Sequence, residues 1–121
     1  MKKILFVEDF LVMQDMYRDA FEKEGYTVHF AQDGTDALKK VDEEKYAVVF
    51  VDMLLPVMNG IEFLEEFSER PPTTKVYALS DFSDPETIDR AKELGIEDYL
   101  RKTDYPPSKL VKLVATIAKE G

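Results

Sequence analysis

Short apolar runs alternate along the chain with longer segments in which apolar residues recur every three or four positions. The apolar runs, rich in β-branched and aromatic residues, predict strands at residues 3–7, 27–31, 47–51, 75–80 and 97–102. The longer segments predict helices at residues 12–25, 33–44, 59–70, 83–95 and 106–121. Strand and helix alternate five times, which indicates an α/β fold: a single doubly wound, five-stranded parallel sheet with helices on both faces.

The first and fourth predicted helices carry signals for their boundaries. Gly25 and Gly95 are placed to end them, because glycine readily adopts the left-handed conformation that follows a helix. Ser83 and Glu86 have the spacing of a capping box, and Pro85 suits a first helical turn. One face of the first helix is expected to lie in the core, and it carries Met13, Met16, Ala20 and Phe21.

Size and composition narrow the class of protein. A chain of 121 residues fits one domain spanning residues 1–121. The formal net charge of −9 argues against a surface that binds nucleic acid directly, and the absence of cysteine excludes disulfides and thiolate metal sites. No apolar run approaches the ~20 residues of a membrane span, and the N-terminal run is too short for a signal peptide. We therefore expect a cytoplasmic protein that does not bind membranes.

Polar residues lie at the carboxyl ends of four of the predicted strands. Glu8 and Asp9 follow the first strand, Asp52 follows the third, and Ser80 and Lys102 are the last residues of the fourth and fifth. In parallel α/β sheets the carboxyl ends of the strands lie along one edge, where ligands bind. We therefore expect these side chains to converge at that edge.

The chemistry that this set suits is phosphoryl transfer to a carboxylate. A buried carboxylate such as Asp52 requires a partner, a metal or a proton. Glu8, Asp9 and Asp52 supply the hard oxygen ligands that Mg²⁺ prefers, and Asp52 is the natural nucleophile. Lys102 and the Ser80 hydroxyl can hold phosphoryl oxygens and stabilise their charge.

In these motifs the sequence resembles the receiver domain of two-component response regulators, whose fold is that of the chemotaxis regulator. The matching elements are the acidic pair in FVEDF, the stretch DMLLPVMNG with Pro56 and Gly60 after Asp52, the ALS at the fourth strand, and DYLRK. The resemblance covers essentially the whole chain. It implies a flavodoxin-like (βα)5 sheet in the order 2-1-3-4-5.

The resemblance also implies roles for individual residues. Asp52 would accept a phosphoryl group from the phosphohistidine of a histidine kinase or a phosphotransfer protein. Mg²⁺ would be held by Asp9, Asp52 and the backbone carbonyl of Leu54, and Glu8 would act through a metal-bound water. The chain would be a switch with self-phosphorylation and self-dephosphorylation chemistry only, rather than a turnover enzyme.

Ser80 and Tyr99 match the family's switch pair. In that scheme the hydroxyl moves to the phosphoryl group and the aromatic ring turns inward. The face made by the fourth helix, the fifth strand and the fifth helix would then exchange downstream partners, and the same face could form a homodimer. Packing at the sheet edge is a second interpretation of Tyr99, as packing is of His29.

Three features depart from the family pattern. Thr103 follows Lys102 where proline, often in a cis bond, is usual, so the geometry of the Lys102–Thr103 bond is open. Asp81 follows the switch hydroxyl where a small residue is usual, and a second acid there would repel phosphate. Leu54 and Phe82 flank the site with apolar side chains that cannot orient an attacking water, which predicts slow self-dephosphorylation.

Other functions remain open at this stage. A pseudo-receiver that binds partners without phosphorylation is compatible with Asp81 and the missing proline. An aspartyl-phosphate phosphatase of the haloacid-dehalogenase type is disfavoured, because it would place an Asp-x-Asp pair after the first strand and needs room for a cap. A flavodoxin-like cofactor binder is weaker still, because the segment after the first strand is acidic where a phosphate would sit.

Overall fold

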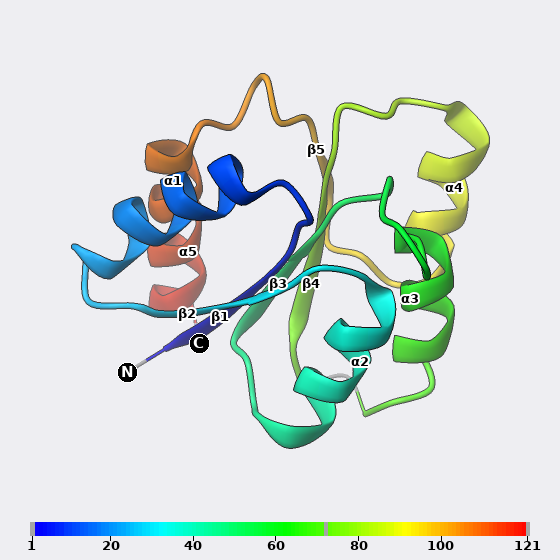
Figure 1. Ribbon diagram of the computed structural model, residues 1–121, viewed down its shortest axis with the longest axis horizontal. Helices are drawn as coiled ribbons and strands as arrows, with labels where there is room; N and C mark the ends of the chain where they lie inside the picture. Colours follow the sequence, from blue (N-terminus) through cyan, green and yellow to red (C-terminus); the bar gives the residue numbers. More distant parts are fainter. Residues whose placement is uncertain (1, 72, 121) are drawn as a thin grey trace.

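The computed structural model describes residues 2–71 and 73–120 (Figure 1). Gly121, the last residue of the fifth predicted helix, lies outside the described residues. The strands are β1 (Lys3–Val7), β2 (Thr27–Ala31), β3 (Val48–Val51), β4 (Lys75–Leu79) and β5 (Tyr99–Leu100). The helices are α1 (Leu11–Glu22), α2 (Gly34–Glu43), α3 (Gly60–Phe67), α4 (Pro85–Glu93) and α5 (Pro107–Glu120).

All strand pairs are parallel, and the sheet order is β2-β1-β3-β4-β5, which confirms the predicted fold class. Val7 at the end of β1 pairs with Ala31 on one side and Val51 on the other, so the tips of three strands are level. Helices α1 and α5 cover one face of the sheet, and α2, α3 and α4 cover the other (Figure 1).

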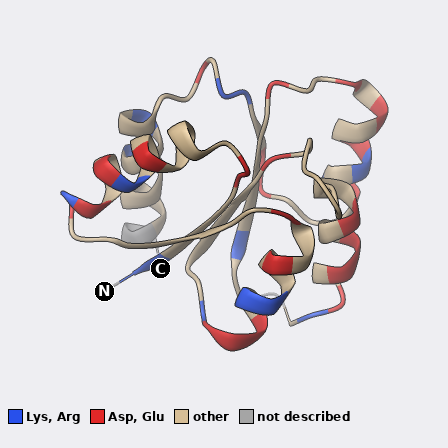
Figure 2. Cartoon of the chain, in the orientation of Figure 1, with Lys and Arg blue, Asp and Glu red and all other residues tan. Residues whose placement is uncertain are grey.

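The strands bury side chains on both faces, as the continuous apolar runs predict. In β1, Ile4 and Phe6 pack on the α1/α5 side, and Leu5 and Val7 pack on the side of α2, α3 and α4. Phe6 stacks on Tyr17 of α1 with ring centroids 4.3 Å apart. Acidic residues are spread over the helices α1 to α4 on both faces of the sheet (Figure 2). No helix among the described residues combines the length and apolarity needed to cross a bilayer.

The core face of α1 differs from the predicted one. Met16 is 46% exposed, whereas Gln14 and Tyr17 are buried together with Phe21. The helix is rotated so that Gln14 reaches the end of β1, where its amide donates a 2.6 Å hydrogen bond to the backbone carbonyl of Glu8. A polar residue can occupy this core position because it satisfies a strand-end carbonyl, and the apolar pattern of the sequence could not reveal that.

The predicted start of α4 was also wrong. The N-cap is Asp84 rather than Ser83: its carboxylate accepts hydrogen bonds from the backbone N–H of Thr87 at 3.1 Å and from the Thr87 hydroxyl at 3.0 Å. This cap places Pro85 at the first helical position, where its missing N–H is not needed. Gly95 has φ +101° directly after the helix, as expected of a stop signal.

Several elements are shorter than expected; α3, for example, spans Gly60–Phe67 instead of residues 59–70. β5 comprises only Tyr99–Leu100 instead of residues 97–102, because the chain turns away from the sheet before Lys102. Helix α1 ends at Glu22, and Gly25, with φ +89°, lies in the turn that follows. The shortness of β5 matters for the site, because the lysine extends from a turn and not from a strand.

One buried hydroxyl supports a stability prediction. Among the described residues, nothing accepts from or donates to the hydroxyl of Tyr17, and burial raises its pKa. Tyr17→Phe is therefore expected to raise the free energy of unfolding by about 1 kcal/mol, because it removes an unsatisfied polar group. Tyr46→Phe is the matched control: the buried Tyr46 hydroxyl lies 2.7 Å from His29 Nδ1. Its loss is expected to lower stability by about 1 kcal/mol in urea unfolding, and equal signs for both variants would contradict the prediction.

Candidate functional site

The site begins at the ends of two neighbouring strands. Glu8 directly follows β1, and Asp52 directly follows β3, the strand hydrogen-bonded beside it. The backbone N–H of Asp52 still donates to the carbonyl of Val7 at 3.1 Å, so the two acidic residues continue the sheet. In the order β2-β1-β3, strand β1 lies at the point where the order reverses, the place at which open parallel sheets bind ligands.

Lys102 joins these two acids. Its Nζ lies 2.6 Å from Glu8 Oε1 and 2.7 Å from Asp52 Oδ2. Glu8 is 3% exposed and Asp52 is 8% exposed, so the lysine compensates two carboxylates that have little access to water. Burial by itself would lower the pKa of Lys102, but the hydrogen bonds to Asp52 and Glu8 outweigh burial and hold the pKa above its usual value.

The remaining oxygen of each acid is held by the backbone. Asp52 Oδ1 accepts a 3.1 Å hydrogen bond from the N–H of Leu54, and Glu8 Oε2 accepts a 3.2 Å bond from the N–H of Phe10. Lys102 and the Leu54 N–H together hold the Asp52 carboxylate at a fixed position, which is what a nucleophilic carboxylate requires.

The loop after β3 is shaped by the start of α3. The N–H of Gly60 donates to the Met53 carbonyl at 3.2 Å, and Asn59 and Glu62 form a reciprocal capping box at the helix start. The backbone of Asp52 and Met53 passes so close to Gly60 that a Cβ there would lie 2.5 Å from the Asp52 carbonyl oxygen. The glycine eight residues after Asp52 therefore has a steric cause: a side chain at position 60 would clash with the backbone of Asp52 and Met53.

Ser80 directly follows β4, and Tyr99 begins the neighbouring strand β5. Ser80 is buried, and its Oγ accepts a 3.2 Å hydrogen bond from the N–H of Phe82. The Tyr99 hydroxyl donates to the backbone carbonyl of Phe82, and burial of the ring raises the pKa of Tyr99. Both members of the expected switch pair therefore contact Phe82 in the loop between β4 and α4.

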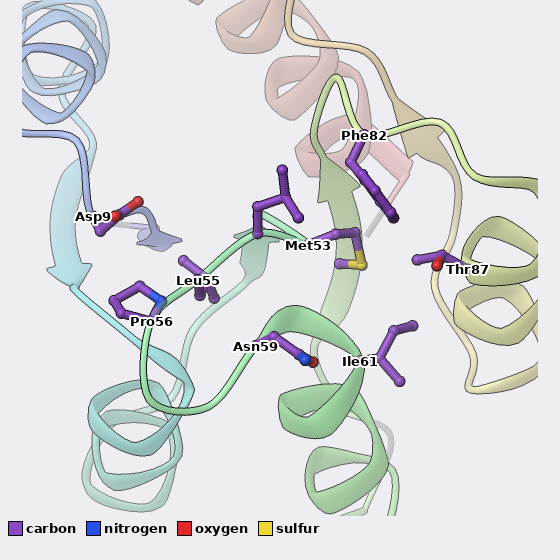
Figure 3. Close-up of a pocket in the computed structure, with 9 residues that line it drawn as sticks. Asp9, Met53, Leu55, Pro56, Asn59, Ile61, Phe82 and Thr87 are labelled. Carbon is purple, nitrogen blue, oxygen red and sulfur yellow. The ribbon is translucent and has the colours of Figure 1, made fainter.

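Asp9 is separate from the Lys102 cluster. It is exposed, and it borders an open cavity of about 500 Å³ whose wall includes Leu54, Phe82 and Thr87 (Figure 3). The cavity runs between the β3–α3 loop and the start of α4. Of the residues expected to converge, Glu8, Asp52 and Lys102 touch one another, and Asp9 lies at the mouth of the adjoining hollow.

The donor set fits a divalent cation of the magnesium type. Glu8 and Asp52 share the single ammonium of Lys102, and Asp9 follows Glu8 directly in the chain, so the acids outnumber the ammonium and leave a net negative charge for a cation to balance. Within the described ranges, no three carboxylate or imidazole side chains are gathered closely enough to enclose a metal. Mg²⁺ usually takes only one or two carboxylates and completes its shell with water and phosphate oxygens, so an open set of oxygens suits it.

One of the open geometric questions is answered by the backbone. No peptide bond among the described residues is cis, so the Lys102–Thr103 bond is trans. The residue that inspection of the sequence missed is Gln14, which fixes the Glu8 carbonyl from α1. Gln14 lies three residues before Tyr17 and seven before Phe21, in phase with the buried face, but as a polar residue it carried no apolar signal in the sequence.

Comparison with known proteins decides the family. The sequence model described as "Response regulator receiver domain" matches residues 4–115 of the chain. The chain belongs to this family. Receiver domains act in two-component signalling, are typically phosphorylated on an aspartate, typically use Mg²⁺ and interact with histidine kinases or phosphotransferases. They are phosphoacceptor switches and not classical enzymes.

Individual relatives agree with this assignment. The receiver domain is 30% identical over 119 residues to the chemotaxis protein CheY of Thermotoga maritima, with 98% of each chain covered. It is 32% identical over 101 residues to sporulation initiation phosphotransferase F of Bacillus subtilis, with 84% of this chain and 82% of that protein covered.

Solved structures give the same picture. A CheY-like receiver domain protein from Methanospirillum hungatei superposes with a TM-score of 0.90 at 27% identity, covering 100% of this chain and 99% of that one. The BeF3-activated DrrB receiver domain has a TM-score of 0.83 at 30% identity, with 98% of each chain covered.

Proposed function

We propose that this receiver domain, spanning residues 1–121, is a phosphorylatable switch in which Asp52 is the phosphoacceptor. The observation that carries the proposal is the pairing of the buried Asp52 carboxylate with Lys102, which also binds Glu8. The donor would be the phosphohistidine of a histidine kinase or a phosphotransfer protein. A carboxylate oxygen of Asp52 attacks phosphorus, the P–N bond to the imidazole breaks, and the released imidazole takes up a proton.

Each neighbouring group has a role in that step. Lys102 is released from its carboxylates to hold a phosphoryl oxygen, and the Ser80 hydroxyl binds a second one, so that both stabilise the spreading negative charge. Asp9, Asp52 and the backbone carbonyl of Leu54 would hold Mg²⁺, and Glu8 would reach it through a bound water. The metal supplies charge neutralisation between the acidic residues and the incoming phosphoryl oxygens.

The switch would be transmitted through Phe82. Ser80 and Tyr99 both hydrogen-bond to the backbone of this residue, so movement of the Ser80 hydroxyl toward a phosphoryl group would release the N–H of Phe82. Tyr99 would then lose its present acceptor and turn inward. The face made by α4, β5 and α5 would thereby change its affinity for a downstream effector, or for a second copy of the chain.

The test is a phosphorylation assay with a small donor. The protein is incubated with acetyl phosphate, with Mg²⁺ or with excess chelator, and separated under acidic and alkaline conditions. We expect a Mg²⁺-dependent adduct that survives acid and is lost in base, as an acyl phosphate should be. Absence of both the adduct and Mg²⁺ binding would favour the pseudo-receiver, and turnover of a general phosphomonoester would favour the phosphatase.

The adduct is expected to persist for minutes or longer. Leu54 and Phe82 border the cavity beside Asp52 with apolar side chains, and neither can orient an attacking water. Leu54→Asn is expected to shorten the lifetime by about tenfold at most, because it places a hydrogen-bonding group at the cavity wall. The same substitution at Val57, an exposed residue of this loop outside the cavity wall, is the control. Decay within seconds in the wild type, measured after removal of the donor, would contradict the prediction.

A further inference from the structure

The two departures from the family pattern that flank the site touch each other. Asp81 directly follows Ser80, and Thr103 directly follows Lys102, in loops that leave neighbouring strands. Asp81 Oδ1 accepts a 3.1 Å hydrogen bond from the backbone N–H of Thr103, and the Thr103 hydroxyl lies 3.4 Å from the same oxygen. Asp81, which was expected from the sequence to repel phosphate, therefore accepts a hydrogen bond from the loop that carries Lys102.

This contact joins the two loops beyond the end of the β4–β5 pairing. The regular pairing ends at Leu79 and Leu100, and the N–H of Ser80 then donates to the Leu100 carbonyl at 2.9 Å. The bond from Thr103 to Asp81 comes next, with a side-chain carboxylate in place of a backbone carbonyl. The backbone hydrogen bonds that close the turn are donated by the N–H groups of Asp104 and Tyr105 to the Arg101 carbonyl. Among the described residues, the Thr103 N–H takes no part in them and donates to Asp81 instead.

Lys102 depends on that turn for its position. β5 has two residues and lies at the sheet edge, so a strand does not fix the backbone of Lys102. Its Nζ must nevertheless reach both Glu8 and Asp52, which follow strands β1 and β3. The Asp81–Thr103 bond is the contact immediately beside Lys102 that joins its turn to the loop bearing the switch hydroxyl.

The negative charge of Asp81 would oppose this benefit by repelling the phosphoryl group, but that repulsion is expected to be weak. Asp81 is exposed, and Coulomb interactions between exposed groups are weakened by water and salt. A hydrogen bond from a backbone N–H to a carboxylate is stronger than one between neutral groups and constrains the loop directly. The geometric effect should therefore outweigh repulsion of the phosphoryl group.

We propose that Asp81 is a positioning residue, which holds the turn at Thr103 so that Lys102 is aimed across the site at Asp52. Its consequence for phosphorylation rests on the proposed function, whereas its effect on Lys102 does not. Asp81→Asn retains an acceptor oxygen and loses the charge, and Asp81→Ala loses both. Asp104→Ala is the matched control for charge, because Asp104 is an exposed residue of the same turn and its carboxylate has no partner among the described residues.

The experiment combines two readouts that need no phosphoryl group with one that does. NMR of the unphosphorylated protein follows the Lys102 ammonium signal and the exchange protection of the Thr103 amide, and acetyl phosphate gives the rate of adduct formation. In Asp81→Ala we expect a shifted Lys102 signal, an unprotected Thr103 amide and a rate about threefold to tenfold lower. Asp81→Asn and Asp104→Ala should stay within about twofold of the wild type in rate and keep the Lys102 signal.

A double-mutant comparison isolates the bond itself. Thr103→Pro removes the N–H, and Asp81→Ala in that background is expected to change neither the Lys102 signal nor the rate further. The proposal is overturned if Asp81→Ala leaves the Lys102 signal unchanged, or if Asp81→Ala and Asp81→Asn accelerate phosphorylation equally, which would make the charge decisive. If the wild type forms no adduct, the proposed function fails, and the positioning role is decided by the two NMR readouts alone.

Discussion

Asp52→Asn is expected to abolish the phosphoryl adduct, to below about one hundredth of the wild-type level. The substitution removes the anionic oxygen that would attack phosphorus and leaves a side chain of nearly the same shape. Asp9 is not placed to take over, because it is exposed and, among the described residues, the ion pairs of Lys102 are with Glu8 and Asp52 and not with Asp9.

This variant should remain folded, so that its failure can be assigned to chemistry. The carbonyl oxygen of the introduced amide can still accept a hydrogen bond from the Leu54 N–H or from Lys102, and Lys102 keeps its ion pair with Glu8. We expect a change in the free energy of unfolding of about 1 kcal/mol or less, measured by urea denaturation. Asp104→Asn, which removes one charge from an exposed turn, is the control and should form the adduct normally. An adduct of wild-type amount on Asp52→Asn would exclude Asp52 as the acceptor.

Gly60→Ala is expected to lower the free energy of unfolding by about 2–4 kcal/mol. A Cβ at this position would lie 2.5 Å from the Asp52 carbonyl oxygen and 2.7 Å from Met53 Cα, and backbone atoms cannot turn aside as a flexible side chain can. Gly60 is not among the glycines with positive φ, and it begins α3. Alanine would otherwise suit this helical position, so the whole expected effect is steric.

The same substitution should also slow phosphorylation, because relief of the clash must displace the Asp52–Met53 backbone. Urea unfolding gives the stability change, and the acetyl phosphate assay gives the rate. Gly25→Ala is the matched control: nothing lies within 4 Å of a Cβ at Gly25, so only its φ of +89° opposes alanine, at about 1 kcal/mol. The prediction is wrong if Gly60→Ala lowers the free energy of unfolding no more than Gly25→Ala does, because the β3–α3 loop would then accommodate the new Cβ by a small shift.

The sequence predicted the fold, and it predicted which polar residues lie at the site edge of the sheet, through one regularity. Strands β1 and β3 are nearly continuous apolar runs, and polar residues mark the ends of β1, β3 and β4, so the sequence assigns Glu8, Asp52 and Ser80 to a common edge. Parallel strands bring those ends together by geometry alone. That is why residues as distant in sequence as Glu8 and Lys102 could be expected in one place.

Contacts that depend on helix rotation were not predictable in the same way. Met16 was expected in the core and is exposed, whereas the polar Gln14 is buried because it bonds to the Glu8 carbonyl. The start of α4 at Asp84 in place of Ser83 depends similarly on which oxygen reaches an N–H. The intrinsic helix and N-cap preferences of the alternative residues differ by only about a fraction of a kcal/mol, so tertiary packing decides which residue is buried and which one caps the helix.

The sequence by itself determined the order of strands and helices, the polar residues at the strand ends and the family, because hydrophobic periodicity and motif spacing are local properties of the chain. Only the tertiary structure decided that Lys102 joins Glu8 with Asp52, that Asp9 stands apart beside an open cavity, and that Asp81 binds Thr103. The physical reason is that these contacts are made between loops. Their distances depend on where each strand stops and how each turn closes, and no single segment of sequence encodes that.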